Sequence, residues 1–263
     1  MEFDPAVRSY YDKGDEAARL GGASLERVRT QELLERFLPG GPLEILDVGG
    51  GPGIYAAWLA ERGHRVLLVD PIPLHTQQAA AAHPDVIAEV GDARQLAQDN
   101  ASFDVVLLLG PLYHLIERDE RLVALREAKR VLRPGGLLFA AAISRFAALL
   151  DLLVNHDRLH EPEIGRLVEE SVRTGVFRGS GEGGLFTTGY FHLPGEFSAE
   201  IAEAGFGDVE IFNLEGPGFF VADLESRWDD PDRREALLRA ARLVEQEPAM
   251  LGASSHLLAV ARG

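Results

Sequence analysis

Apolar residues along this chain gather in short runs that alternate with longer amphipathic segments. The first five runs lie at 44–48, 65–70, 86–93, 102–110 and 137–142, and each is short and apolar enough to be a strand buried in a sheet. Segments with helical periodicity lie between them. Regular alternation of strand and helix predicts a parallel, doubly wound α/β sheet.

The residues before the first run predict two helices, at about 5–12 and 24–37. Ser24 is a suitable N-cap for the second helix, and the turn Pro39-Gly40-Gly41-Pro42 ends it. The sheet is therefore preceded by a helical segment.

After residue 144 the regular alternation gives way to a longer irregular region. Residues 146–172 carry an apolar stripe and predict one or two helices, and six glycines lie between Gly175 and Gly189. We interpret the glycine-rich segment as a mobile loop or a hairpin, which serves either as a substrate lid or as a plain surface connection. The elements expected beyond it are a helix at 194–204, a strand at 206–213, a charged helical insertion at 223–246 and a last strand at 256–262.

The charge balance restricts the partners of the protein. The chain has 42 acidic and 26 basic side chains, a formal net charge of −16, so DNA, RNA or an anionic membrane would be repelled at long range. No apolar run approaches the ~18 residues of a transmembrane helix, and the acidic N-terminus lacks the apolar core of a signal peptide. There is no cysteine for disulfide or thiolate chemistry. We expect a cytoplasmic protein that binds neither nucleic acid nor membranes.

The most informative local feature is the glycine-rich turn after the first strand, Asp47-Val48-Gly49-Gly50-Gly51-Pro52-Gly53. Glycines let a ligand approach the bare backbone, and the helix pattern from Ile54 places free N–H groups beside the turn. A dinucleotide-binding turn has the spacing G-x-G-x-x-G, whereas this one reads G-x-G-x-G and has Ile54 at the sixth position. The turn predicts a nucleotide-type cofactor other than a dinucleotide, with a simple strand-to-helix turn as the alternative.

Four further segments follow the glycine-rich turn in a characteristic order. Asp70 ends the second strand and Gly91-Asp92-Ala93 the third, while Ser102-Phe103-Asp104-Val105-Val106 opens the fourth and Arg130-Val131-Leu132-Arg133-Pro134-Gly135-Gly136 precedes the fifth. With the D-x-G-x-G-x-G turn, this order resembles the class I methyltransferases that depend on S-adenosyl-L-methionine (SAM), in particular the type 11, UbiE-like small-molecule methyltransferases. The resemblance is close over residues 43–143 and extends further only in outline.

The resemblance implies a Rossmann-like, seven-stranded mixed sheet whose last strand is antiparallel, with N-terminal helices and a helical substrate cap. The corresponding division of the chain is N-terminal helices that cover the cofactor site at 1–42, a SAM-binding core at 43–144, a cap or lid at 145–192, and a C-terminal half of the core at 193–263 with a helical insertion at about 223–247. This insertion departs from the minimal fold and is either a second piece of lid or a subunit contact, such as that of a homodimer.

The resemblance also implies SAM as the methyl donor and S-adenosyl-L-homocysteine (SAH) as its product. Asp70 would hold the ribose hydroxyls, Asp92 and Ala93 would read the adenine edge, and Asp47 would support the glycine-rich turn. Solvated or packed side chains remain alternatives for Tyr11 and Arg29. The expected cofactor-binding residues are Tyr11, Arg29, Gly49, Gly50, Gly51, Gly53, Asp70, Pro71, Ile72, Asp92, Ala93, Leu109 and Gly110.

Methyl transfer from SAM needs a general base only when the acceptor must lose a proton. Tyr113 and His114 follow the fourth strand, where ligands bind in an open α/β sheet, and His192 follows the expected cap. These three are the candidate catalytic residues, with His114 or His192 as the base because histidine exchanges protons near neutral pH. The alternative is that each histidine caps a helix or lines the pocket without chemistry.

Three tyrosines are candidate walls of the substrate site: Tyr10, Tyr113 and Tyr190. Simple packing is the alternative, since aromatic rings supply much buried area in any core. His156 and His160 stand four residues apart on an expected helix, a spacing that can bind a metal. Their order is not H-E-x-x-H, so we expect no metal site.

The function expected from these residues is transfer of a methyl group from SAM to a small-molecule acceptor by in-line displacement. The alternatives are a non-catalytic SAM-binding regulatory or partner subunit, a protein or RNA methyltransferase, and a nicotinamide oxidoreductase. The acidic chain and the expected cap weigh against a polymer substrate. The acceptor atom, whether oxygen, nitrogen or carbon, is left open by the sequence.

Overall fold

A computed structural model describes residue 11 and residues 24–183, 185–221 and 223–263. Within them the central sheet has the strand order β3-β2-β1-β4-β5-β9-β8. All of its neighbouring strands are parallel except β9, which runs antiparallel to β5 and to β8. This confirms the expected seven-stranded mixed sheet with an antiparallel last strand. The strands are β1 (Glu44–Val48), β2 (Arg65–Asp70), β3 (Ile87–Val90), β4 (Phe103–Leu108), β5 (Leu132–Ser144), β8 (Gly207–Asn213) and β9 (His256–Arg262).

The bounds of β5 and β3 differ most from the expected ones. β5 begins at Leu132, which pairs with Phe103 of β4, and the register between the two strands shifts before they pair again at Leu137. β3 ends at Val90, so Asp92 and Ala93 lie in the loop beyond it and face the end of the sheet. This shorter strand places the loop where a ligand at the carboxyl ends of the strands can meet it.

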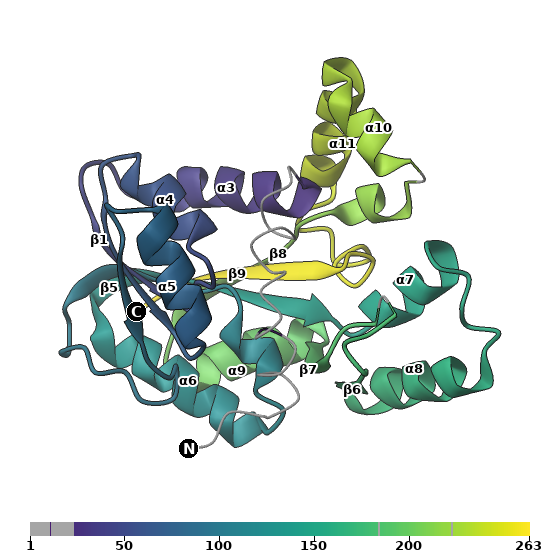
Figure 1. Cartoon of the computed structure of the whole chain (residues 1–263), viewed down its shortest axis with the longest axis horizontal. Coiled ribbons are helices and arrows are strands. Elements are labelled where there is room, and N and C mark those ends of the chain that lie inside the picture. Colours follow the sequence, from purple (N-terminus) through teal and green to yellow (C-terminus); the bar gives the residue numbers. More distant parts are fainter. Residues whose placement is uncertain (1–10, 12–23, 184, 222) are drawn as a thin grey trace.

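Helices cover both faces of the sheet (Figure 1). One face carries α3 (Leu25–Phe37), α4 (Ile54–Ala60) and α5 (Pro73–Ala82), whose apolar residues share a buried core with β1, β2 and β9. The opposite face carries α6 (Arg118–Val131) and α9 (Pro194–Glu203), which form a second core with β4 and β5. This layering is the doubly wound arrangement that alternating strands and helices predict.

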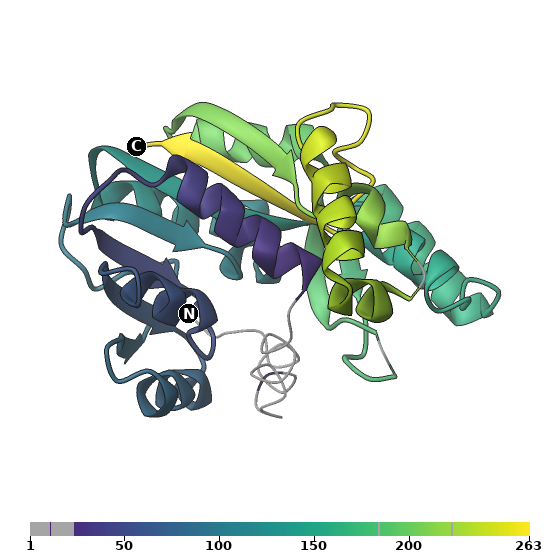
Figure 2. The ribbon, with the colours of Figure 1, turned by 90° about the horizontal axis from the view of Figure 1, so that it is seen from above.

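The expected helix at 24–37 is present as α3, with the Ser24 side chain accepting a hydrogen bond from the Arg27 N–H at 3.1 Å. The expected helix at 5–12 lies outside the described residues except for Tyr11. The charged helical insertion consists of two helices, α10 (Leu224–Asp229) and α11 (Pro231–Leu243). The break occurs because Asp230 is extended and caps α11, and Pro231 begins it. Figure 2 shows α11 beside the N-terminal end of α3.

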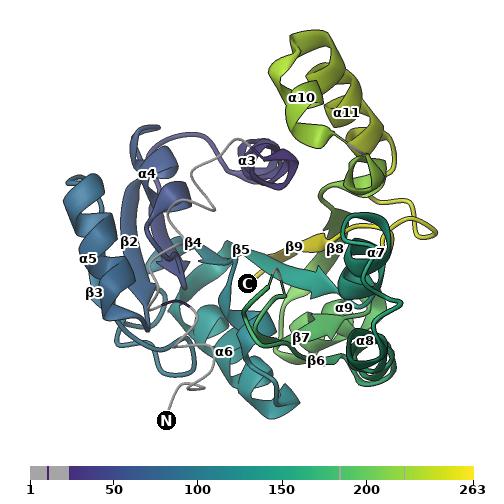
Figure 3. The same cartoon turned by 45° about the vertical axis from the view of Figure 1, so that its right-hand side comes forward.

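Residues 145–192 project from the end of β5 (Figure 3). They contain α7 (Ala147–Val154), α8 (Pro162–Thr174) and a hairpin of β6 (Val176–Arg178) and β7 (Thr188–His192). Of the two structures expected for the glycine-rich segment, a mobile loop or a hairpin, the structure has the hairpin. β7 also continues the sheet, because Phe191 and His192 pair in parallel with the last two residues of β5. No helix of the described residues is long and apolar enough to cross a membrane.

Candidate functional site

A cavity of about 960 Å³, partly open to solvent, lies at the carboxyl ends of β1, β2 and β4. We call it the cofactor cavity. The structure brings thirteen of the expected site residues to its wall. They are Tyr11, Gly49, Gly50, Gly51, Asp70, Pro71, Ile72, Asp92, Ala93, Leu109, Gly110, Tyr113 and His114.

The glycine-rich turn needs its glycines for two separate reasons. Gly49, Gly51 and Gly53 have φ values of 72°, 56° and 89°, in the left-handed region that strains other residues. Gly49 also has no room for a side chain, since a Cβ there would lie 2.6 Å from the Pro111 ring. The turn therefore packs directly against Pro111, which begins the segment that carries Tyr113 and His114.

Asp70 connects the glycine-rich turn with the end of β2. One of its carboxylate oxygens accepts a hydrogen bond from the Gly51 N–H at 2.9 Å. The other accepts from the Ile72 N–H at 2.8 Å and lies 3.1 Å from Nδ1 of His75. These contacts hold a buried carboxylate at the wall of the cofactor cavity.

Asp47 lies under the glycine-rich turn and is almost fully buried. Neither of its carboxylate oxygens has a hydrogen-bond partner among the described residues. Burial, with a smaller contribution from the charge of Asp70, raises the pKa of Asp47 to about 7. We expected Asp47 to support the glycine-rich turn, but among the described residues its carboxyl group makes no hydrogen bond to the turn. The carboxyl group does pack closely against Gly50, where a Cβ would lie 2.6 Å from it.

The Asp92 carboxylate is hydrogen-bonded to Arg94. The Arg94 guanidinium donates to both Asp92 oxygens, at 2.7 to 3.2 Å, and the Arg94 backbone N–H donates at 2.9 Å. Partial burial alone would raise the pKa of Asp92, but these bonds lower it. Asp92 is thus a fixed, ionised group at the cavity wall.

Tyr11 and His114 close one side of the cofactor cavity. The Tyr11 hydroxyl lies 2.8 Å from Nε2 of His114, and the two rings meet edge-on with centroids 5.3 Å apart. His114 ends a short 3-10 helix, η1 (Pro111–His114), and its ring also contacts Tyr113. Tyr113 and His114 therefore lie together at the wall, as their position after β4 indicates.

Other expected site residues do not line the cofactor cavity. The buried Arg29 is bound to Glu32 and Glu245, and Gly53 begins α4 behind the turn. Tyr190 lies over the Arg121 guanidinium at 3.7 Å, and Tyr10 lies outside the described residues.

His192 belongs to a buried polar network instead of a cavity wall. It is fully buried, and its Nε2 lies 3.3 Å from Glu200, which also takes two hydrogen bonds from Arg121 at 2.7 and 2.9 Å. Burial lowers the pKa of His192. Burial would raise the pKa of Glu200, but the bonds from Arg121 and His192 lower it to about 2. Arg121 also donates to the carbonyls of Leu115 and Ile116, so the network supports the segment that follows His114.

Sequence reasoning missed His75 and Glu26, which also line the cofactor cavity. His75 lies in the first turn of α5, directly after β2, and this closeness in sequence to Asp70 could have indicated their contact. Glu26 lies in the first turn of α3, and no local pattern relates it to the site.

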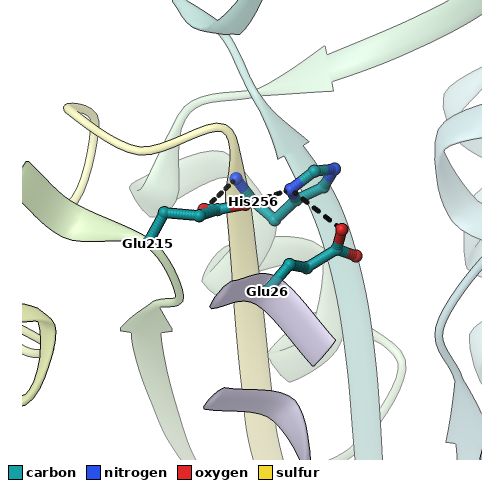
Figure 4. A group of neighbouring side chains, drawn as sticks. All are labelled: Glu26, Glu215 and His256. Atoms are coloured by element: carbon teal, nitrogen blue, oxygen red, sulfur yellow. Dashed lines mark hydrogen bonds and ion pairs between the residues drawn. The ribbon is translucent and has the colours of Figure 1, made fainter. Parts of the chain in front are cut away.

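One group of described residues has the donor atoms of a metal site: Glu26, Glu215 and His256 (Figure 4). Their ligand atoms lie within 4.8 Å of one another. His156 and His160 are not part of it; His156 lies 3.4 Å from Asp151.

Comparison with known proteins relates residues 46–140 to a family described as a methyltransferase domain. An uncharacterized methyltransferase of Mycobacterium tuberculosis is 37% identical over 107 residues, which are 41% of this chain and 42% of that protein. The ubiquinone/menaquinone biosynthesis C-methyltransferase UbiE of Rubrivivax gelatinosus is 33% identical over 132 residues, 50% of each chain. The matched part is thus about half the length of these relatives or less.

A solved structure extends the likeness to most of the fold. The S-adenosylmethionine dependent methyltransferase from Mesorhizobium loti has a TM-score of 0.60 and 21% identity, over 91% of this chain and all of that one. At this identity the likeness shows the fold alone.

Proposed function

Because the chain carries a class I, SAM-dependent methyltransferase domain, we propose that the protein is an enzyme that transfers the methyl group of SAM to a small-molecule acceptor. SAM supplies an electrophilic methyl group on a sulfonium. The protein then has to bind the two molecules, orient them in line and exclude water.

The observation that carries this proposal is the contact between Asp70 and the glycine-rich turn at the wall of one cavity. An ionised carboxylate has about four acceptor positions, and the Gly51, Ile72 and His75 donors use three of those on Asp70. A position remains on the oxygen that faces Gly51. This arrangement suits a ribose hydroxyl, which can donate to Asp70 while the turn lies against the nucleoside.

The cavity also has polar groups that fit the methionine end of SAM. The buried Asp47 oxygens are without partners in the described chain, and an ammonium group is a partner that would favour their ionised form. Gly49 lines the cavity and carries no side chain, so a ligand there can meet its backbone directly.

The remaining cofactor contacts follow from the walls of the cavity. We assign Ile72 to packing against the adenine and Asp92 with Ala93 to its edge. Arg94 holds Asp92 in place for this contact. We do not assign Arg29 or Gly53 to the cofactor, because neither lines the cavity.

His114 is the proposed proton acceptor of the reaction. It lines the cavity and Tyr11 orients its ring, whereas His192 is enclosed in the Arg121–Glu200 network. Tyr113 forms the wall next to it. An acceptor with a transferable proton would pass that proton to the His114 ring as its lone pair attacks the methyl group.

Isothermal titration calorimetry tests the cofactor assignment directly. We expect SAM and SAH to bind at micromolar strength and NAD to give no heat. Asp70→Asn should weaken SAH binding by roughly 1.5–3 kcal/mol, the scale of a hydrogen bond to a charged group. Asp85→Asn is the matched control, since Asp85 is exposed and outside the cavity. Folded protein that binds neither SAM nor SAH would refute the proposal.

A further inference from the structure

We propose that the acceptor is an apolar amine whose ammonium group is recognised by a carboxylate cluster of Glu26, Glu215 and His256. The inference rests on the proposed methyl transfer and names the class of acceptor. Three features support it: a second cavity beside the first, a fixed negative charge between the two, and the absence of basic side chains from the described walls.

The second cavity, which we call the cap cavity, lies between the end of β5, α7 and the β6–β7 hairpin. The space within it, open solvent included, is about 580 Å³. Its walls are mainly apolar, with the rings of Phe177, Phe186 and Phe191 among them. A body of fused or single rings, or a branched alkyl group, would be desolvated here.

The cap cavity and the cofactor cavity share a wall. Phe186, which lines the cap cavity, stacks on His114 with ring centroids 5.7 Å apart and approaches Tyr113 at 6.1 Å. His114 and Tyr113 line the cofactor cavity. An acceptor held in the cap cavity therefore lies next to the proposed proton acceptor.

The side chains of the carboxylate cluster lie together (Figure 4), and two of its members line different cavities. Glu26 lines the cofactor cavity, His256 lines the cap cavity, and His256 Nδ1 lies 3.7 Å from Glu26 and 2.5 Å from Glu215. Glu215 is buried, and it also accepts from the Ser254 hydroxyl at 2.5 Å and the His256 N–H at 3.0 Å. These bonds fix the carboxylate and the ring.

The cluster keeps a negative charge in either state of the histidine. Burial would raise the pKa of Glu215, but the charge and hydrogen bond of His256 and the bond from Ser254 lower it. With both glutamates ionised, the cluster has a net charge of −1 when His256 is protonated and −2 when it is neutral. An ammonium group next to Glu26 would gain a charge-assisted hydrogen bond.

The charges of the described walls favour a cationic acceptor over an anionic one. Among the described residues that line the two cavities there is no lysine or arginine, while Glu26 and Asp151 are present in addition to the acids around the proposed cofactor. A carboxylate or phosphate would lose its hydration there without gaining a positive partner. The aromatic walls, by contrast, attract a cation.

A divalent metal ion fits the cluster less well than an ammonium group. Ligands bound at about 2.0–2.2 Å around a tetrahedral ion lie about 3.3–3.6 Å apart. Nδ1 of His256 and the Glu215 carboxylate are instead in direct hydrogen-bond contact. An ion would have to separate the two groups that hold the cluster together.

The reaction balances without another reagent. The ammonium group gives one proton to the His114 ring, and the freed nitrogen lone pair forms the new N–C bond. The C–S bond of the sulfonium breaks and its electron pair stays on sulfur. The products are a methylated ammonium ion and neutral SAH, and His114 returns its proton to solvent.

The test uses three acceptors of one shape: 3-phenylpropylamine, 3-phenylpropanol and 3-phenylpropanoic acid. Each is incubated with the full chain and methyl-labelled SAM, and its binding to the SAH complex is measured by calorimetry. We expect the amine alone to bind and to gain one methyl group on nitrogen. Methylation of the alcohol or the acid in preference to the amine, or neither binding nor methylation of the amine, overturns the inference.

Glu26→Gln tests the cluster itself. We expect the KM of the amine to rise at least about tenfold, on the scale of one lost charged hydrogen bond, with kcat changed less than about threefold. Glu35→Gln, an exposed change on the same helix, should leave both unchanged. An unchanged KM in Glu26→Gln refutes the role of the cluster.

Two further outcomes separate this inference from its alternatives. Loss of activity with EDTA that Zn²⁺ or Mn²⁺ restores would replace amine recognition with a metal site. Failure to bind SAM or SAH would refute the methyltransferase proposal, whereas SAH binding with no preference for the amine refutes only the acceptor class.

Discussion

The Tyr11 hydroxyl and Nε2 of His114 lie 2.8 Å apart although 103 positions of sequence separate them. The contact brings a residue from the N-terminal segment onto the loop after β4, and both rings line the cofactor cavity. His75 touches the other edge of the Tyr11 ring, with centroids 5.4 Å apart. Tyr11 thus joins the Asp70–His75 side of the cavity to the His114 side.

Substitution of His114, the proposed proton acceptor, should slow methyl transfer without affecting cofactor binding. We expect His114→Ala to lower kcat by roughly 10²–10⁴ at neutral pH with little change in SAH affinity. The wild-type rate should rise with pH through the histidine range, near ~6.5 before any environmental shift, and the variant should lose this rise. Steady-state kinetics with the natural acceptor measures both. If His114→Ala keeps wild-type kcat, the acceptor is already a good nucleophile and proximity alone drives transfer.

The Arg121–Glu200 pair should contribute to stability rather than to chemistry. Glu200→Gln leaves a buried guanidinium without its charged partner, and breaking such a pair costs roughly 3–5 kcal/mol. Urea unfolding at pH 7 measures the loss. Glu203→Gln, on the same helix but in an exposed pair with Arg118, should change the unfolding midpoint little.

The pH dependence of this network has a definite sign. The pKa of Glu200 is lowered to about 2 from an ordinary 4.5, so its contribution is complete above pH 4.5 and is lost as the pH falls toward 2. The lowered pKa of His192 adds a loss that begins as the pH falls through about 6.5. The stability gap between wild type and Glu200→Gln should therefore shrink in acid. A gap that is constant down to pH 2.5 would contradict this.

Asp47→Asn should stabilise the protein in the absence of ligand. The pKa of the buried carboxyl is raised to about 7 from 3.8, so the native state holds a proton that the unfolded state releases, and stability falls as the pH rises from 3.8 to 7. Asparagine has no carboxyl proton to release, so the substitution removes this loss of stability with rising pH. Thermal unfolding should show a larger gain for the variant at pH 8 than at pH 5, and SAH affinity should fall if Asp47 meets the ligand. An equal gain at both pH values would argue that Asp47 is not perturbed by burial.

Two glycine substitutions should have opposite effects. A Cβ at Gly179 would collide with the Phe186 carbonyl and lie 2.5 Å from the Phe177 ring, so Gly179→Ala should distort the hairpin and raise the KM of the acceptor. Gly195 in α9 has open space around it, and Gly195→Ala should stabilise the protein by roughly 0.5–1 kcal/mol. Calorimetric unfolding and kinetics of both variants test the contrast. A Gly179→Ala enzyme with wild-type KM would separate the hairpin from the acceptor site.

The sheet could be predicted because each strand is a short continuous segment in which apolar residues predominate. Residues 44–48, 65–70 and 256–262 were recognisable as strands from their own composition, and the structure has strands with the same bounds. For residues 175–189 the sequence left a loop and a hairpin open, since glycines allow both. Its pairing with the end of β5 depends on residues more than thirty positions away.

Side-chain partners were predictable only where they are close in sequence. The contact of Asp70 with the Ile72 N–H is of this local kind. The partners of Arg29 and His192 are not, because Glu245 and Glu200 come from other elements that the fold brings against them. Arginine and histidine are suitable residues for a cofactor or catalytic site, but carboxylates bind both of these side chains away from the cofactor cavity.

The sequence by itself determined the alternation of strands and helices, the glycine-rich turn and the acid that follows β2, because backbone conformation and hydrophobic periodicity act over a few residues. Only the tertiary structure decided which histidine faces a cavity and which is buried. It also decided that Glu26, Glu215 and His256 meet from three distant segments between two cavities. Charge and burial at a site depend on every element packed around it, and no short stretch of sequence contains that information.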